Sequence, residues 1–90
     1  MKKITDKEFK DLLKDDKCIF DNYEINGLNN TIYVEDSINF YNCKLSNINF
    51  RFKQSTLFRE CEIVSCSFNK NAELGFYECL FKYTIFPHSL

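Results

Sequence analysis

The stretch that decides the fold is residues 38–50, with the sequence INFYNCKLSNINF. Within it Phe40, Leu45 and Phe50 lie five residues apart, and a smaller or branched residue stands two places before each of them. A helical period of 3.6 residues does not produce a spacing of five, and a simple hairpin strand would alternate by two for longer. The spacing is typical of short strands that carry two inward side chains and then turn a corner.

This pattern repeats along the chain every eighteen positions. Large apolar side chains form three columns, which are Phe40, Phe58 and Phe76; Leu45, Ile63 and Phe81; and Phe50, Phe68 and Phe86. The residues two places earlier form three further columns, which are Ile38, Thr56 and Leu74; Cys43, Cys61 and Cys79; and Ile48, Cys66 and Thr84. None of these positions is charged, so we expect equivalent residues to stack in the interior of a repeat protein.

The pattern extends towards the N-terminus with one insertion. Phe20 matches Phe40 at a shift of twenty positions, and Cys18 stands before it as the small residue. Two extra residues within 27–30, GLNN, restore the shift of eighteen and place Ile32 in the column of Phe50. We therefore expect an irregularity near residues 27–30.

The N-terminal segment predicts a helix over residues 6–14. Thr5 and Glu8 have the spacing of a capping box, and Ile4 and Phe9 have the spacing of a hydrophobic staple. The apolar face of this helix would consist of Phe9, Leu12 and Leu13. A helix this short is marginal alone, so we expect it to cover the first repeat.

The repeat resembles the pentapeptide-repeat family, whose five-residue units have a large central Leu or Phe and a small residue two places earlier. The matching units are CKLSN (43–47), INFRF (48–52), TLFRE (56–60), CEIVS (61–65), CSFNK (66–70), CLFKY (79–83) and TIFPH (84–88). The resemblance covers roughly residues 18–88. It implies a right-handed quadrilateral β-helix, often an end-to-end dimer, without catalytic activity.

Two departures from that family matter. Its turns usually contain four units of five, so a repeat of eighteen predicts an irregular side near residues 52–55 and 70–73, and only Asn39 and Asn49 match the family's intermediate Asp or Asn. A triangular solenoid with a turn of the same length is the alternative, although its usual step of six does not match. We expect a mainly β chain forming a single domain over residues 1–90. Residues 1–17 would be a short N-terminal capping α-helix and residues 18–90 a right-handed parallel β-helix, a solenoid of about four coils.

Composition narrows the class of protein. The chain has 90 residues and a net charge of −1, which argues against direct nucleic-acid binding because that needs clustered positive charge. Its ten Asn and two Gly suggest that Asn replaces Gly at corners. The five Cys are odd in number and the N-terminus is charged at once, unlike a signal peptide. No apolar run approaches a membrane span. We expect a reduced, cytoplasmic protein without a membrane segment, in a bacterium or a phage-infected host cell.

Catalytic and metal-binding interpretations find little support. The spacing of Cys61 and Cys66 permits zinc, but the thiols fall on the repeat columns, where Cys packs as a small hydrophobe. The only His, His88, forms no recognisable motif with Cys79, and no Gly-rich phosphate loop is present in the sequence. We expect a non-enzyme with reduced thiols, no metal and no cofactor.

Two outward features predict binding to other proteins. One is a column of residue types that are enriched at binding hot spots, with acidic neighbours, and its members are Tyr41, Arg59, Tyr77, Glu60 and Glu78. A simple packed edge is the alternative. The other is the apolar last repeat, where a homodimer interface would consist of Leu80, Tyr83, Ile85, Phe86 and Leu90. The alternative is a tail that folds over its own end.

Function follows as a set of hypotheses. The first is a binding protein that inhibits an enzyme acting on nucleic acids. The resemblance implies a topoisomerase modulator, and the small Lys-, Asn- and Ile-rich chain suggests a phage or mobile-element antagonist of host defence, anti-CRISPR proteins included. Its partners would be a second copy of itself and an unidentified protein target. The alternatives are a structural assembly module and a small-ligand-binding homo-oligomer.

Overall fold

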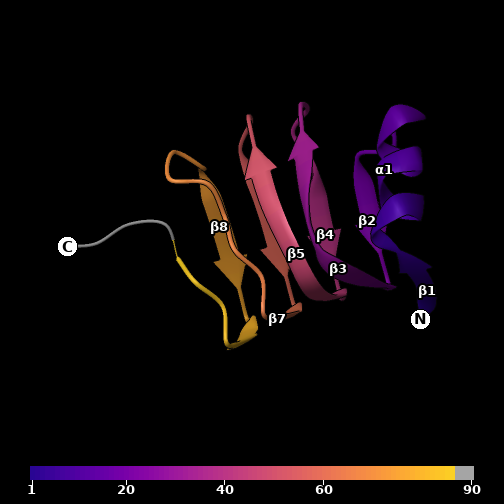
Figure 1. Ribbon diagram of the computed structural model, residues 1–90. Coiled ribbons are helices and arrows are strands. Elements are labelled where there is room, and N and C mark those ends of the chain that lie inside the picture. The colour runs from indigo at the N-terminus through magenta and orange to yellow at the C-terminus, as the bar shows by residue number, and fades with distance from the viewer. Residues whose placement is uncertain (87–90) are drawn as a thin grey trace.

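The computed structural model describes residues 1–86 and is mainly β, with one short helix (Figure 1). In chain order the elements are β1 (Lys2–Thr5), α1 (Asp6–Lys14), β2 (Ile19–Asp21), β3 (Tyr23–Val34), β4 (Asn39–Tyr41), β5 (Lys44–Phe52), β6 (Thr56–Arg59), β7 (Glu62–Val64), β8 (Leu74–Tyr77) and β9 (Leu80–Lys82). The buried apolar residues form one cluster. The fold is therefore organised around a single core, with α1 at one end.

The strands form two parallel sheets between which the chain alternates. One sheet has the order β1-β3-β5-β7-β9 and the other the order β2-β4-β6-β8. From β4 onwards equivalent strands pair at a shift of eighteen positions, as Phe40 pairs with Phe58 and Phe58 with Phe76. Each repeat therefore adds one strand to each sheet, as the spacing predicts.

The predicted insertion is confirmed. Before it, Phe20 pairs with Phe40, a shift of twenty positions. The register of β3 against β5 changes between Asn26 and Asn30, after which Ile32 pairs with Phe50 and the shift is eighteen. Gly27 sits inside this bulge, and a Cβ there would overlap the backbone of Asn47. The insertion therefore needs glycine where two backbones meet closely.

Stacked aromatic rings fill the core. Phe58 is fully buried and its ring stacks between Phe40 at 4.9 Å and Phe76 at 5.0 Å. Phe68 stacks in the same way between Phe50 at 5.8 Å and Phe86 at 6.1 Å. These contacts confirm the predicted columns, because each ring packs against the ring at the equivalent position of the next repeat.

The N-terminal segment confirms the helix and corrects its surroundings. Thr5 and Glu8 form the capping box, and Phe9 is fully buried against Phe20, with ring centroids 5.0 Å apart. Residues 1–17 do not consist of a capping helix alone, however. Residues 2–5 form β1 and pair in parallel with β3. The edge of β3 presents unpaired backbone groups that a helix cannot satisfy, whereas a strand can.

Cys18 is a second correction. The pattern places it among the inward small residues, and its carbonyl accepts a hydrogen bond from the backbone N–H of Asn39 at 2.9 Å, as that register requires. Its side chain is nevertheless exposed. No earlier repeat stacks on this position and α1 ends at Lys14, so nothing in the described residues covers the thiol.

The corners between strands use left-handed backbone. Eight positive φ angles fall on two sets of equivalent positions, one at Asn22, Asn42, Glu60 and Glu78, the other at Asn29, Asn47, Ser65 and Tyr83; a ninth is at Asp16, just after α1. Within residues 1–86 no glycine has a positive φ. Asn takes four of these eight corners, all in the earlier repeats, because it tolerates this region better than most residues. Glu, Ser and Tyr take the other four, so the composition predicts only part of the corners.

Glu60 provides a test of the corner geometry, because a Glu has no special tolerance of its φ of 54°. We expect Glu60→Asn to raise the free energy of unfolding by about 0.5–1 kcal/mol, since Asn is the less strained residue there. Chemical denaturation measures the change. The matched control is Glu62→Asn, at a strand position, which should not stabilise the protein. Equal effects of the two substitutions would contradict the corner assignment.

Candidate protein-binding surfaces

The predicted Tyr–Arg–Tyr column exists on the outer side of the sheet β2-β4-β6-β8. Tyr41 pairs with Arg59, and Arg59 pairs with Tyr77. The Arg59 guanidinium lies 5.5 Å from the centre of the Tyr77 ring, and Tyr77 is 54% exposed. A cation–π contact of this kind holds a flexible arginine in place. The column is therefore a preformed surface with an ordered charge.

Glu60 and Glu78 lie beside this column, but at corners rather than in strands. Both are exposed and both have a φ of 54°. Their position follows from the turn that they make. Their carboxylates are left at the edge of the surface, where they can meet a partner's cations.

A shallow groove adjoins the column, and sequence analysis did not identify it. It has a volume of about 320 Å³ and is lined by residues that include Leu57, Gly75 and Tyr77. Gly75 occupies the position that Asn39 and Leu57 hold in earlier repeats. The missing side chain leaves a hollow beside Tyr77, and the change from Leu57 to Gly75 was the signal that could have revealed it.

The last repeat changes the character of the outer surface. Lys3, Glu24, Lys44 and Glu62 alternate in charge along one row of paired strands, and Leu80 is the next member. In a second row, the Ser67 hydroxyl donates to Asn49 Oδ1 at 2.8 Å, and Ile85 follows. Both rows are polar until the last repeat, so the switch to apolar residues is confined to this end.

Four of the five residues predicted for a dimer interface are exposed at this end. The exposed fractions are 55% for Leu80, 87% for Tyr83, 71% for Ile85 and 39% for Phe86. Leu90 lies outside the described residues. Among residues 1–86, β8 and β9 are the last strands of their sheets and pair on one side only. The described part of this end therefore combines open strand edges with exposed apolar side chains.

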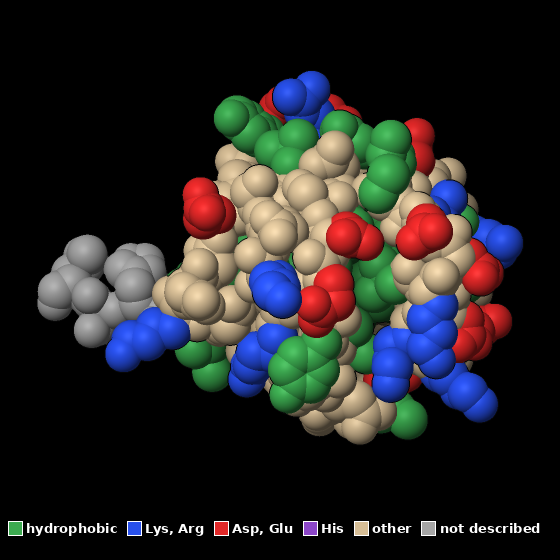
Figure 2. Space-filling model, turned by 90° about the horizontal axis from the view of Figure 1, so that it is seen from above, with side chains coloured by type: hydrophobic (Ala, Val, Ile, Leu, Met, Phe, Trp, Pro, Cys, Tyr) green, Lys and Arg blue, Asp and Glu red, His purple; other side chains and the backbone are tan. Residues whose placement is uncertain are grey.

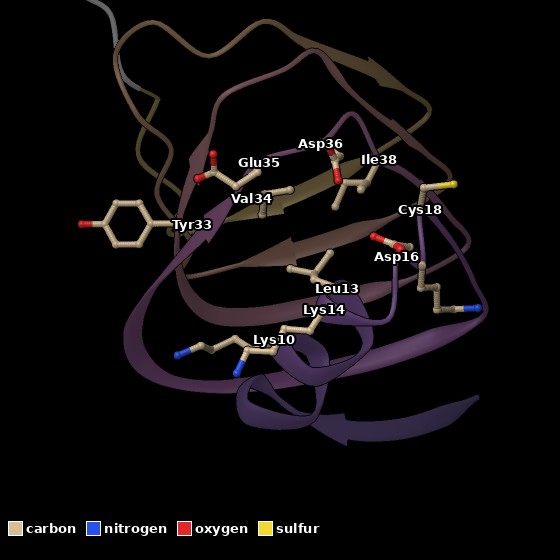
Figure 3. Close-up of a pocket in the computed structure, with 11 residues that line it drawn as sticks. Lys10, Leu13, Lys14, Asp16, Cys18, Tyr33, Val34, Glu35, Asp36 and Ile38 are labelled. Carbon is tan, nitrogen blue, oxygen red and sulfur yellow. The ribbon is translucent and has the colours of Figure 1, made fainter.

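A cleft between α1 and residues 33–38 was also not foreseen. It has a volume of about 310 Å³. Figure 3 shows Leu13 facing Val34 and Ile38 across it, with Lys10 and Lys14 on the helix side. The opposite rim carries Glu35 and Asp36. Only the fold brings these segments together, because they lie about twenty residues apart in the chain.

The cysteines are unpaired thiols, and their environments differ. The side-chain hydrogen bond from Cys61 lowers the pKa of Cys43 to about 7, and the same bond raises the pKa of Cys61. Burial raises the pKa of Cys66 to about 11. Cys18 and the half-buried Cys79 are more accessible. The pKa of Cys43 therefore lies below the usual range of a thiol, whereas the pKa values of Cys61 and Cys66 lie above it.

Charges are mixed over the surface. Figure 2 shows acidic and basic side chains interspersed, with apolar groups between them and more charge towards the α1 end. The net charge is −1. His88 lies outside the described residues, so the pairing of Cys79 with His88 considered above has no described geometry. Within residues 1–86, no helix combines the length and apolar character that crossing a membrane requires.

Comparison of the chain with protein-family models, with curated proteins and with solved structures gave no significant match.

Proposed function

We propose that this chain is a right-handed parallel β-helix of the pentapeptide-repeat type, capped by α1, that acts without catalysis by binding another protein. The β-helix interpretation is supported by the constant shift of eighteen positions in both sheets. It is also supported by the stacking of equivalent phenylalanines and by the elongated shape, with extents of 36 × 23 × 23 Å. We call each such circuit of the chain a coil.

The observation that carries the binding function is the Tyr41–Arg59–Tyr77 column. Its side chains project from strands rather than loops, and Arg59 is already held against Tyr77. A surface that is ordered before binding loses little conformational entropy on association. Tyr and Arg are also the residue types that most often dominate binding energy. The adjoining groove at Gly75 offers a hollow for one partner side chain.

The C-terminal end supports a second contact, with another copy of the chain. Leu80, Tyr83, Ile85 and Phe86 supply exposed apolar area around two open strand edges. A two-fold contact would cover both ends with one self-complementary patch and leave no edge to recruit further strands. The proposed active form is therefore a homodimer that presents two Tyr–Arg–Tyr columns.

The class of target rests on the resemblance to pentapeptide-repeat proteins. It is an enzyme that acts on nucleic acids, such as a topoisomerase or a nuclease of host defence. The net charge of −1 argues against mimicry of DNA by overall charge, because DNA is strongly negative. The local acidic edge formed by Glu60, Glu62 and Glu78 is the part of the surface that could face a basic nucleic-acid-binding site.

Two other functions are each favoured by one observation. The apolar C-terminal end suits an assembly module that contacts only itself. The cleft beside α1, with a volume of about 310 Å³, is large enough for a small ligand. A protein-binding function differs from both, because it depends on Arg59 and Tyr77.

Binding of the parent and two variants to purified type II topoisomerase and to purified CRISPR nuclease tests the proposal. We expect one of these enzymes to bind, and Arg59→Ala combined with Tyr77→Ala to weaken binding by roughly tenfold or more, as loss of a hot spot does. The matched control is Tyr33→Ala, since Tyr33 is an exposed tyrosine on the other sheet. Binding of neither enzyme would contradict the target class. Binding unaffected by the double substitution would contradict the proposed surface.

A further inference from the structure

Gly75 interrupts a row of outward-facing side chains on the sheet β2-β4-β6-β8. Asn39 and Leu57 hold the equivalent positions in the two earlier repeats, and the three residues pair in register. A glycine inside a strand weakens the strand, and it often marks a bulge, a close approach of another backbone or the approach of a ligand. The presence of Gly75 therefore needs a physical reason.

Neither the backbone nor a close neighbour requires this glycine. The φ of Gly75 is not positive, and β6 and β8 pair there without a bulge. A Cβ on Gly75 would lie 3.4 Å from the Cδ1 of Leu57 and 3.8 Å from the Cε2 of Tyr77, which are ordinary contact distances. Gly27 differs, because a Cβ there would overlap the backbone of Asn47. Approach of a ligand therefore remains as the reason for Gly75.

The missing side chain opens the shallow groove of about 320 Å³ beside Tyr77. This volume is at the lower end of the range for ligand pockets, so it suits one long side chain. Leu57 and Leu74, both half-buried, give the groove an apolar wall, and the Arg59 guanidinium holds the ring of Tyr77 from 5.5 Å. The other lining residues besides Gly75 are Ser37, Asn39, Ser55, Thr56 and Glu73.

Glu73 is the one charged residue that lines this groove among the described residues. Its side chain is exposed, and within residues 1–86 the single ion pair joins Lys53 and Glu35. The Glu73 carboxylate therefore has no cationic partner in the described part of the chain. The groove combines an apolar wall with one free negative charge, which is complementary to a side chain with an apolar stem and a positive tip.

We propose that the groove at Gly75 receives one lysine side chain of the partner protein. The aliphatic stem lies over Gly75 against Leu57, and the ammonium group pairs with the Glu73 carboxylate. Lysine fits better than arginine, because it has the longer apolar stem and a point charge that one carboxylate can satisfy. This inference rests on the proposed protein-binding function, and it names the residue type that the surface recognises.

Titration of the ¹⁵N-labelled protein with Nα-acetyl-lysine N-methylamide, followed by NMR at low salt, tests the groove without any partner enzyme. We expect saturable shifts concentrated at the amides of Leu57, Glu73 and Gly75, with a dissociation constant on the order of millimolar. The norleucine analogue, which has a similar stem and no charge, should bind roughly threefold more weakly or worse. Glu73→Gln should weaken binding of the lysine probe by a similar factor, whereas Glu78→Gln, at a corner outside the groove, should not.

Filling the groove should separate binding from stability. Gly75→Leu restores the residue type of Leu57 and should remove the probe-induced shifts. Gly75→Ala should raise the midpoint of thermal unfolding by about 2–6 °C, because the native backbone accepts a side chain there. The matched control for binding is Thr31→Leu, at an exposed position on the other sheet, which should leave the shifts unchanged.

Four results of the titration would overturn the lysine assignment. They are absence of shifts at the groove, undiminished binding by Gly75→Leu, equal binding of the norleucine probe, and tighter binding of the matching arginine probe. Failure of the proposed function is distinguishable from these. If the lysine probe binds as expected but neither topoisomerase nor nuclease does, the groove stands and the target class fails. If an enzyme binds through Arg59 and Tyr77 but tolerates Gly75→Leu, the groove fails and the function stands.

Discussion

Replacing Phe58 with alanine is expected to lower the free energy of unfolding by about 3–5 kcal/mol. Phe58 is fully buried and stacks between Phe40 and Phe76. Truncation would leave a cavity that touches three successive repeats, and close-packed neighbours relax only partly into such a space. A domain of this size has about 5–15 kcal/mol to lose, so the variant should sit near the limit of folding. Urea denaturation of parent and variant measures the difference.

Phe86→Ala is the matched control for this prediction. Phe86 belongs to the neighbouring aromatic column, but 39% of it is exposed and it stacks on Phe68 from one side only among the described residues. We expect it to cost less than half as much as Phe58→Ala, about 1–2 kcal/mol. Equal costs at the two positions, or an unchanged midpoint in Phe58→Ala, would show that the columns do not carry the stability.

The second large effect concerns self-association. Leu80→Glu combined with Ile85→Glu should raise the dissociation constant of the proposed homodimer by roughly 100-fold or more, because four buried charges would have to lose water across a two-fold contact. Both side chains are more than half exposed in the single chain, so the variant monomer should fold as stably as the parent. Sedimentation equilibrium over a concentration series measures the constant.

The matched control places the same two changes elsewhere. Ile19 and Leu28 are exposed apolar residues far from the C-terminal end, on β2 and in the bulge of β3. Ile19→Glu combined with Leu28→Glu should leave the dimer intact. A parent that sediments as a monomer at about 100 µM would contradict the interface, because homodimers weaker than this bind too poorly to persist. In that case the apolar C-terminal end would be covered by the chain's own tail, or it would be the surface that binds the target protein.

Much of the fold is predictable because stacking makes the sequence periodic. The columns of Phe58 and Phe68 follow from spacing alone, and so does the two-residue insertion near Gly27. The capping box at Thr5 is a local signal and was equally readable. In each case the physical requirement, stacking of equivalent positions or capping of a helix, restricts residues that are neighbours or evenly spaced in the sequence.

Other features depend on which neighbouring elements are absent around a residue, and the repeat pattern of the sequence does not show this. Cys18 fits its column but is exposed, because no earlier repeat covers it. β1 forms because β3 has an open edge, although residues 2–5 lack the repeat pattern. Val34 and Phe52 are buried, yet neither is the central or the small residue of a five-residue unit.

The candidate surfaces were predictable only in part. The Tyr41–Arg59–Tyr77 column follows from the repeat, and the structure places these residues in register. The groove at Gly75 and the cleft beside α1 arise from side chains of different repeats or of segments that the fold brings together. The corner role of Glu60 and Glu78 was hidden, because Glu is not a residue that favours left-handed backbone.

Stacking of equivalent coils is the central claim, and duplicating one coil tests it most directly. A second copy of residues 38–55 can be inserted after Ser55, because Ser37 precedes the same segment in the native chain. Thermal unfolding followed by circular dichroism then compares this variant with one in which the inserted residues are shuffled. We expect the duplicated chain to unfold in one cooperative transition at a temperature no lower than the parent's, since it gains one more interface between neighbours. A broad, destabilised transition like that of the shuffled insertion would contradict the stacked coils.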